Sequence, residues 1–117
     1  MLPWLFFFSL FSALADELEE GYEALQAGRY DQALAIFENE ANKGNRFARF
    51  NLGVMYLEGV GVEENPVQAY VWFQLAARQG DSLAAQSATI VLKRMTPAQV
   101  VESRNILKEK EKNLLRR

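Results

Sequence analysis

The fold is decided by two consecutive segments of the chain, ARFNLGVMYLEGVGV (residues 48–62) and NPVQAYVWFQLAARQG (residues 65–80). Each segment has the apolar spacing of an amphipathic helix, and the period-two alternation of a strand never lasts. Small residues such as Gly53 and Ala69 allow two helix backbones to approach closely, and large ones such as Trp72 fill the remaining space. Aromatic residues at helical spacing usually form core, so we interpret them as packing residues rather than as a cofactor site.

The chain repeats itself at an offset of 36 residues. The shared unit is a Gln-Ala pair, an aromatic residue four positions after the alanine, a further alanine and then a glycine. A period of this length is typical of stacked helical hairpins. The equivalent positions are Gln32-Ala33 and Gln68-Ala69, Phe37 and Phe73, Ala41 and Ala77, Gly44 and Gly80, and Ala48 and Ala84.

Capping and turn residues divide the chain into six predicted helices. Gly44 and Gly80 can adopt the left-handed conformation that ends a helix, and the polar residue after each of them can cap the next one. Thr96 precedes a proline and forms a predicted capping box with Gln99. The predicted helices span residues 16–27, 30–43, 46–57, 66–79, 82–94 and 97–114, with breaks at Gly28, Gly44, residues 58–65, Gly80 and Met95-Thr96.

Residues 48–84 closely resemble a Sel1-like repeat, because they combine a long loop containing Gly59 and Gly61 with Trp72 in the second helix. Residues 21–44 are nearer to a tetratricopeptide pattern with a shorter connecting loop. The resemblance implies an all-α protein, a short α-solenoid of antiparallel helical hairpins. We expect its repeats at about residues 16–44, 46–80 and 82–114, within a repeat domain spanning residues 16–117, and a polar C-terminal capping helix.

The first fifteen residues have the pattern of a signal peptide. They carry no charged side chain, include an apolar run over residues 5–14 and end in Ala13-Leu14-Ala15, which fits the cleavage pattern of signal peptidase. The run is too short for a membrane span, which needs about 20 apolar residues. We therefore expect cleavage after Ala15 and a periplasmic or secreted protein. An uncleaved interfacial anchor, or an apolar helix that caps the first repeat, remain alternatives, since the segment lacks lysine and arginine.

The composition excludes most familiar catalytic chemistry. The chain has no cysteine and no histidine, so it offers no disulfide, thiolate nucleophile or imidazole ligand. Glu63-Glu64 are adjacent carboxylates on a predicted exposed loop, which favours a solvated loop over a metal or acid–base site. Gly59-Val60-Gly61 lacks the following lysine of a phosphate-binding loop. The basic tail, residues 108–117, is interleaved with glutamate and favours a solvated helical face over a nucleic-acid patch. We predict no catalytic residue, cofactor or metal.

The candidate binding surface lies on the predicted helix 46–57. In hairpin repeats the first helix of each pair lines the concave side of the stack, so residues between its packing positions should face a groove. Phe50, Val54 and Leu57 form one apolar stripe at i, i+4 and i+7, beside the polar residues Asn51 and Glu58. Such a stripe can hold a peptide of a partner protein. The alternative is that the N-terminal helix covers it.

The resemblance implies a protein-interaction module that binds a protein or peptide partner. Two other functions remain open. The chain is an accessory or immunity-like subunit if its two and a half repeats need another repeat protein to complete the stack. Some proteins that resemble this family are linked to cell-wall or β-lactam chemistry, but the sequence has no serine–lysine motif or buried acid pair that would support an enzyme.

Overall fold

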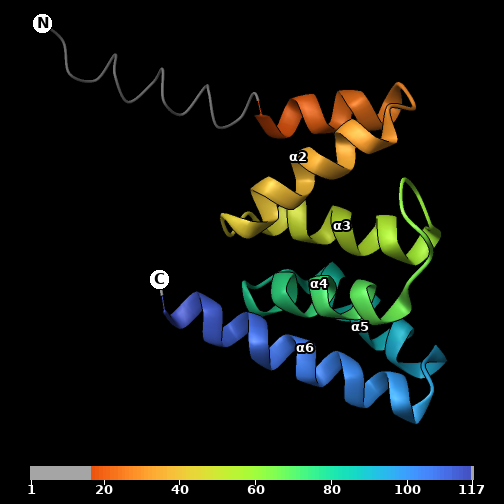
Figure 1. Ribbon diagram of the computed structural model, residues 1–117, viewed down its shortest axis with the longest axis vertical. Coiled ribbons are helices and arrows are strands. Elements are labelled where there is room, and N and C mark those ends of the chain that lie inside the picture. Colours follow the sequence, from red (N-terminus) through yellow and green to blue (C-terminus); the bar gives the residue numbers. More distant parts are fainter. Residues whose placement is uncertain (1–16, 117) are drawn as a thin grey trace, which may run out of the picture.

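The computed structural model describes residues 17–116, and every regular element in this range is a helix (Figure 1). Residues 17–26 form an N-terminal helix, and five further helices follow. They are α2 (Tyr30–Asn42), α3 (Arg46–Glu58), α4 (Pro66–Arg78), α5 (Ser82–Arg94) and α6 (Pro97–Leu115). Their bounds differ from the prediction by at most one residue at each end, which confirms the all-α helical-repeat fold. The predicted signal peptide, residues 1–15, lies outside the described residues.

The helix starts are set by side chains that accept hydrogen bonds from the first turn. The side-chain oxygen of Asn45 accepts from the backbone N–H groups of Phe47 and Ala48, at 2.9 and 3.1 Å. Asn65 and Asp81 cap α4 and α5 in the same way. At α6 both halves of the predicted capping box are present. These bonds satisfy donors that a helix cannot satisfy itself, so each helix begins where its cap residue stands.

Glycines with a positive φ angle make the turns between the helices. Gly44 and Gly80 have φ angles of 99° and 97°, as predicted for residues that follow a helix. Gly59 and Gly61 have φ angles of 68° and 74° in the loop between α3 and α4. A Cβ atom at Gly61 would lie 3.1 Å from the Tyr30 backbone, so the loop packs directly against the start of α2.

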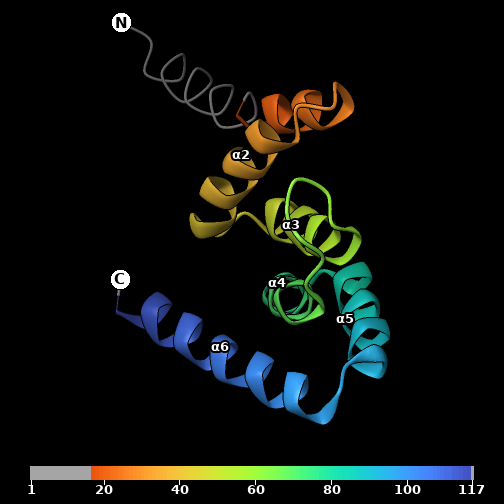
Figure 2. The same ribbon diagram turned by 45° about the vertical axis from the view of Figure 1, so that its right-hand side comes forward.

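Helix α4 occupies the centre of the repeat stack. It packs against α3, α5 and α6, and Figure 2 shows it between these three helices. Its side chains contribute to two apolar clusters. The first cluster joins the N-terminal helix, α2, α3, α4 and α6, and its buried members include Phe37, Leu52, Met55, Trp72 and Leu107. The second joins α4 and α5, and its buried members are Val67, Ala69, Tyr70, Phe73, Ala88, Val91 and Met95.

Helix α6 packs against α4 (Figure 2). It does not form a closely packed hairpin with α5, the helix that precedes it. Leu107 is buried in the first cluster, and the Ser103 hydroxyl donates to the Val100 carbonyl at 2.8 Å. The basic tail, which was predicted to be a solvated face, is not solvated throughout, since Lys110 and Glu111 are partly buried. Lys110 is partly buried because its ammonium lies 4.4 Å from the centroid of the Trp72 ring, and its aliphatic stem covers apolar surface there.

The N-terminal helix is fixed to α2 by packing and by charge. A Cβ atom at Gly21 would lie 3.0 Å from the side chains of Ile36 and Phe37, so the two helices are in close contact. Lys43 forms ion pairs with Glu17 at 3.3 Å and with the buried Glu40 at 3.2 Å. None of the helices described for residues 17–116 is both long enough and apolar enough to cross a membrane.

Candidate binding groove

Helix α3 is held by its neighbours on two sides. On one side Ala48, Leu52 and Met55 are buried in the first cluster against α2. On another, Gly53 faces Phe73 of α4, where an added Cβ atom would lie only 2.5 Å from two ring carbons. The backbone of α3 therefore lies as close to α4 as a glycine permits. This fixed position determines where the remaining side chains of α3 can point.

The predicted apolar stripe lies along a third side of α3. Phe50, Val54 and Leu57 are partly buried and pack against the second cluster. The Phe50 and Phe73 rings have centroids 5.5 Å apart and an interplanar angle of 49°. The stripe thus contributes to the core while retaining some exposed surface. The cluster that it packs against lies on α4 and α5. The sequence analysis had named the N-terminal helix as the element that could cover the stripe.

A groove of about 400 Å³ opens at the start of α3. Phe50 and Asn51 are the two predicted site residues that line it. Val54 and Leu57 do not line it, and Glu58 is exposed at the opposite end of α3. The remaining lining residues come from the N-terminal helix, the first turn of α3, and the turn into α5 with its first residues: Tyr22, Arg46, Phe47, Gly80, Asp81, Ser82 and Leu83. Their role as partner contacts stays a prediction.

Two exposed apolar side chains border this groove, and the sequence analysis did not identify either as a site residue. Phe47 is 49% exposed and Leu83 is 56% exposed. The signal was present, because the two residues stand 36 positions apart, the offset of the repeat. Each follows its helix-capping residue by two positions, so successive repeats present an apolar side chain at the same place. We call the groove that these two residues border, with all its lining residues, the α3–α5 groove.

Asn51 is positioned to offer a hydrogen-bond acceptor in the groove. Its side-chain nitrogen donates to the Tyr22 hydroxyl at 2.9 Å and to the Phe47 carbonyl at 2.7 Å. A carbonyl oxygen can only accept, so the second bond settles which end of the amide is the nitrogen. Both bonds use that nitrogen, which leaves the amide oxygen for an N–H donor of a ligand.

The N-terminal helix contributes a second polar group to the groove, the Tyr22 hydroxyl. The Tyr22 ring packs edge-on against Phe37, with centroids 5.4 Å apart and an interplanar angle of 67°. This contact holds the tyrosine ring while its hydroxyl meets Asn51. At the rim, the Arg46 guanidinium carbon lies 4.9 Å from the centroid of the Phe47 ring. The groove therefore combines apolar walls, one amide and one exposed cation.

Few side chains that line the groove are ionisable. Its only acidic residue is Asp81, whose carboxylate accepts from the Ala84 backbone N–H at 3.0 Å as a helix cap. Within residues 17–116 no three histidine, cysteine, aspartate or glutamate side chains gather as a metal site would require. The two loop carboxylates Glu63 and Glu64 are exposed, as expected for a solvated loop.

Comparisons with known proteins show similarity to proteins built from helical repeats. Residues 46–81 match the family model described as the Sel1 repeat. A crystal structure of a protective antigen from uropathogenic Escherichia coli, which displays an SLR fold, is similar with a TM-score of 0.74 and 27% identity. That similarity covers 83% of this chain and 22% of the antigen.

A relative is named exopolysaccharide production negative regulator, from Rhizobium meliloti strain 1021. It is 37% identical over 60 residues, which are 51% of this chain and 22% of the regulator. This chain thus aligns with about a fifth of the length of both proteins. Together with the α-hairpin geometry of α3 and α4, these similarities show that the chain is a Sel1-like repeat protein, with its matched repeat at residues 46–81.

Proposed function

We propose that this protein is an exported interaction module that binds a peptide segment of a partner protein in the α3–α5 groove. The observation that supports this most strongly is the pair of exposed apolar residues, Phe47 and Leu83, at equivalent positions of successive repeats beside a recess. Exposed apolar residues beside a recess with few, well-placed polar groups are typical of recognition sites. Sel1 repeats typically mediate protein interactions and are typically non-catalytic scaffolds.

Each part of the groove has a defined role in this proposal. Phe47, Phe50 and Leu83 bury apolar side chains of the bound segment. The amide oxygen of Asn51 accepts a backbone N–H of that segment, because its nitrogen is already held by Tyr22 and Phe47. A backbone contact tolerates different ligand side chains, so the apolar pockets set the sequence preference.

Export is proposed from residues 1–15, whose composition fits a cleavable signal peptide. The test is to express the full chain with a C-terminal tag and to determine the N-terminus of the mature product in the periplasmic fraction. Asp16 as the first residue supports export, whereas a cytoplasmic product that begins with Met1 contradicts it. The similarity to a protein named as a negative regulator of exopolysaccharide production supports a regulatory role for this interaction.

The groove is tested by site-specific photo-crosslinking. A benzoylphenylalanine placed at Phe47 should crosslink one partner segment, and the same probe at Val101, which is 58% exposed on α6, is the matched control. Mass spectrometry of the crosslinked peptide identifies the segment that occupies the groove. A crosslink from position 101 and none from position 47 would contradict the groove and support the accessory-subunit alternative, in which the end of the stack meets another chain.

A second measurement gives the strength of the interaction. Replacing Phe47 and Leu83 with serine should weaken binding of the identified segment by about tenfold or more, since truncating an apolar anchor commonly removes at least 1.4 kcal/mol. Val101→Ser should leave the affinity unchanged. Circular dichroism checks that all variants are folded. Equal affinity of the groove variant and the native protein would refute the proposed site.

A further inference from the structure

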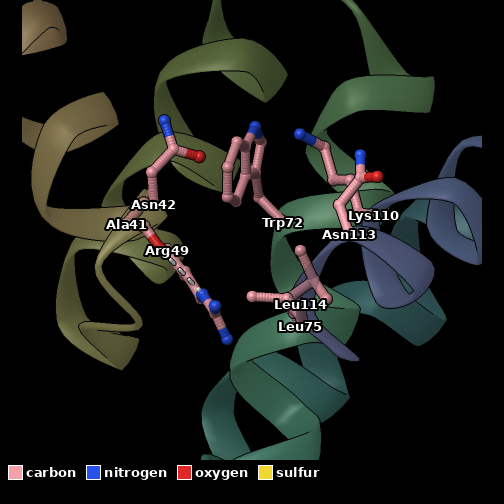
Figure 3. A pocket seen from close by; sticks show the side chains of 8 residues that line it. All are labelled: Ala41, Asn42, Arg49, Trp72, Leu75, Lys110, Asn113 and Leu114. Carbon is pink, nitrogen blue, oxygen red and sulfur yellow. Dashed lines mark hydrogen bonds between the residues drawn. The ribbon is translucent and has the colours of Figure 1, made fainter. Parts of the chain in front are cut away.

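A second recess, which shares no lining residue with the α3–α5 groove, lies between α2, α3, α4 and α6 (Figure 3). Its volume is about 100 Å³. Figure 3 shows Arg49 and Lys110 around Trp72, with Leu75 and Leu114 below the indole ring in this view. The recess thus brings together two basic side chains and an apolar wall. None of the residues that line it is acidic.

Arg49 is fixed in this recess although it is almost completely buried, with 6% of its surface exposed. Its Nε–H donates to the Ala41 carbonyl at 3.1 Å, and its Nη1 donates to the side-chain oxygen of Gln79 at 2.8 Å. The Gln79 nitrogen in turn donates to the Gly44 carbonyl at 2.6 Å. Both acceptors of the guanidinium are neutral, so these bonds position the charge without compensating it. Buried charges are normally paired with an opposite charge.

Lys110 brings a second positive charge to the same recess. Its ammonium rests over the Trp72 ring at 4.4 Å from the centroid. Burial lowers the pKa of Lys110, and the charge of Arg49 lowers this pKa further, while Glu38 acts in the opposite direction. Within residues 17–116 neither Arg49 nor Lys110 forms an ion pair with a carboxylate. An anion in the recess would relieve the repulsion between the two cations and compensate a buried charge.

The size and the lining of the recess restrict the kind of anion. The space is small and partly open to solvent, which favours a compact group such as a carboxylate on a short aliphatic chain. Trp72, Leu75 and Leu114 provide apolar contact, which a bare inorganic anion would not use. We propose that this recess binds a carboxylate carried on an aliphatic group, with Arg49 and Lys110 contacting the carboxylate and the two leucines contacting the aliphatic part. The terminal carboxylate of a peptide and a free organic acid both supply this chemistry.

The test is a titration of the full chain followed by the NMR signal of the Trp72 indole N–H, assigned by comparison with Trp4→Phe. N-acetyl-leucine is the probe, and N-acetyl-leucinamide is the matched control without the charge. We expect saturable shifts with a millimolar dissociation constant for the acid, as is usual for a ligand of about ten heavy atoms. The amide should bind at least about tenfold more weakly, since charge-assisted hydrogen bonds are lost.

Variants at Lys110 test the residue assignment without disturbing the buried Arg49. Lys110→Met keeps an aliphatic cover on Trp72 and removes the charge. It should therefore weaken the binding of N-acetyl-leucine by about tenfold and leave the binding of N-acetyl-leucinamide unchanged. Lys110→Arg should restore binding. Equal binding of acid and amide to the native protein would overturn the proposal, and so would the absence of any saturable shift.

Two further ligands distinguish the source of the anion. Inorganic phosphate that binds as tightly as N-acetyl-leucine would overturn the aliphatic part of the proposal, because it lacks apolar surface. N-acetyl-alanyl-leucine that binds more tightly than N-acetyl-leucine supports a peptide terminus as the natural ligand. Equal affinity of the two supports a free organic acid. Neither result depends on whether the α3–α5 groove binds a partner.

Discussion

The substitution Gly53→Ala tests the close approach of α3 and α4, which determines the geometry of the whole repeat. A Cβ atom at Gly53 would lie 2.5 Å from two carbons of the Phe73 ring and 2.9 Å from a third. Ordinary van der Waals contact begins at 3.4 Å, so the ring or the helix must move by about 1 Å. Phe73 is 1% exposed, and its own ring contacts Phe50, so the surrounding core resists this movement.

Two opposing effects set the expected magnitude. Overpacking a core costs about 1–3 kcal/mol, whereas alanine is favoured over glycine in a helix by about 1 kcal/mol. The difference between these two terms is a net loss of up to about 2 kcal/mol in the free energy of unfolding, or up to roughly 16 °C in Tm for a domain of this size. Gly53→Leu should lower stability more. Urea denaturation followed by circular dichroism measures the loss.

The Phe73→Leu background provides the matched control for this prediction. A leucine leaves space where the added methyl group would clash, so Gly53→Ala should be neutral or stabilising in that background. The double-mutant cycle should therefore show a coupling energy equal to the overpacking cost, about 1–3 kcal/mol, as for residues in direct contact. If Gly53→Ala stabilises the native protein by about 1 kcal/mol, as it would in an exposed helix, the packing described here is wrong.

Three further substitutions test the fold and its charges. Burial raises the pKa of Glu40 above its usual value of 4.5, whereas the pKa of its hydrogen-bonded neighbour Glu17 is lowered. The contribution of Glu40 to stability should therefore fall as the pH rises from 4.5 through the raised pKa, so the difference in Tm between the native protein and Glu40→Gln should change in thermal melts between pH 4 and 8. A constant difference between the two proteins would contradict the assignment. Thr96→Ala removes the N-cap of α6 and should lower the free energy of unfolding by about 1 kcal/mol, whereas an unchanged value would show that the cap is dispensable. The double substitution of Phe50 and Leu57 with serine should destabilise the fold by several kcal/mol in urea, because both side chains pack against the second cluster; full stability would instead place them on an open surface.

The helix boundaries could be predicted because the signals for them are local. Asn45, Asp81 and Thr96 each accept from a backbone group within three residues of themselves, so their effect does not depend on the rest of the molecule. The repeat offset likewise predicted that α3 and α4 pair, since equivalent residues occupy equivalent places in stacked hairpins, but it did not predict that α6 packs against α4. The turn-forming role of Gly59 and Gly61 was predictable for the same reason, since a positive φ angle is a local property, whereas the contact of Gly61 with Tyr30 was not.

The candidate site was only partly predictable from the sequence. The apolar spacing on α3 located the correct helix and two residues of the groove, Phe50 and Asn51. It could not show that the inner surface of the stripe packs against Phe73, because that contact depends on how closely α4 approaches. The exposed Phe47 was overlooked because a periodic pattern describes spacing along one helix, whereas the groove also requires Leu83 from another.

By itself, the sequence determined the class of fold, the order of the helices, the turns between them and the absence of cysteine and histidine chemistry. Only the tertiary structure decided that α6 crosses α4 and places Lys110 over Trp72, or that Gln79 reaches back 30 residues to hold the buried Arg49. The physical reason is the range of the interactions. Caps and turns act over a few residues, while the environment of a charge depends on side chains that only packing brings together.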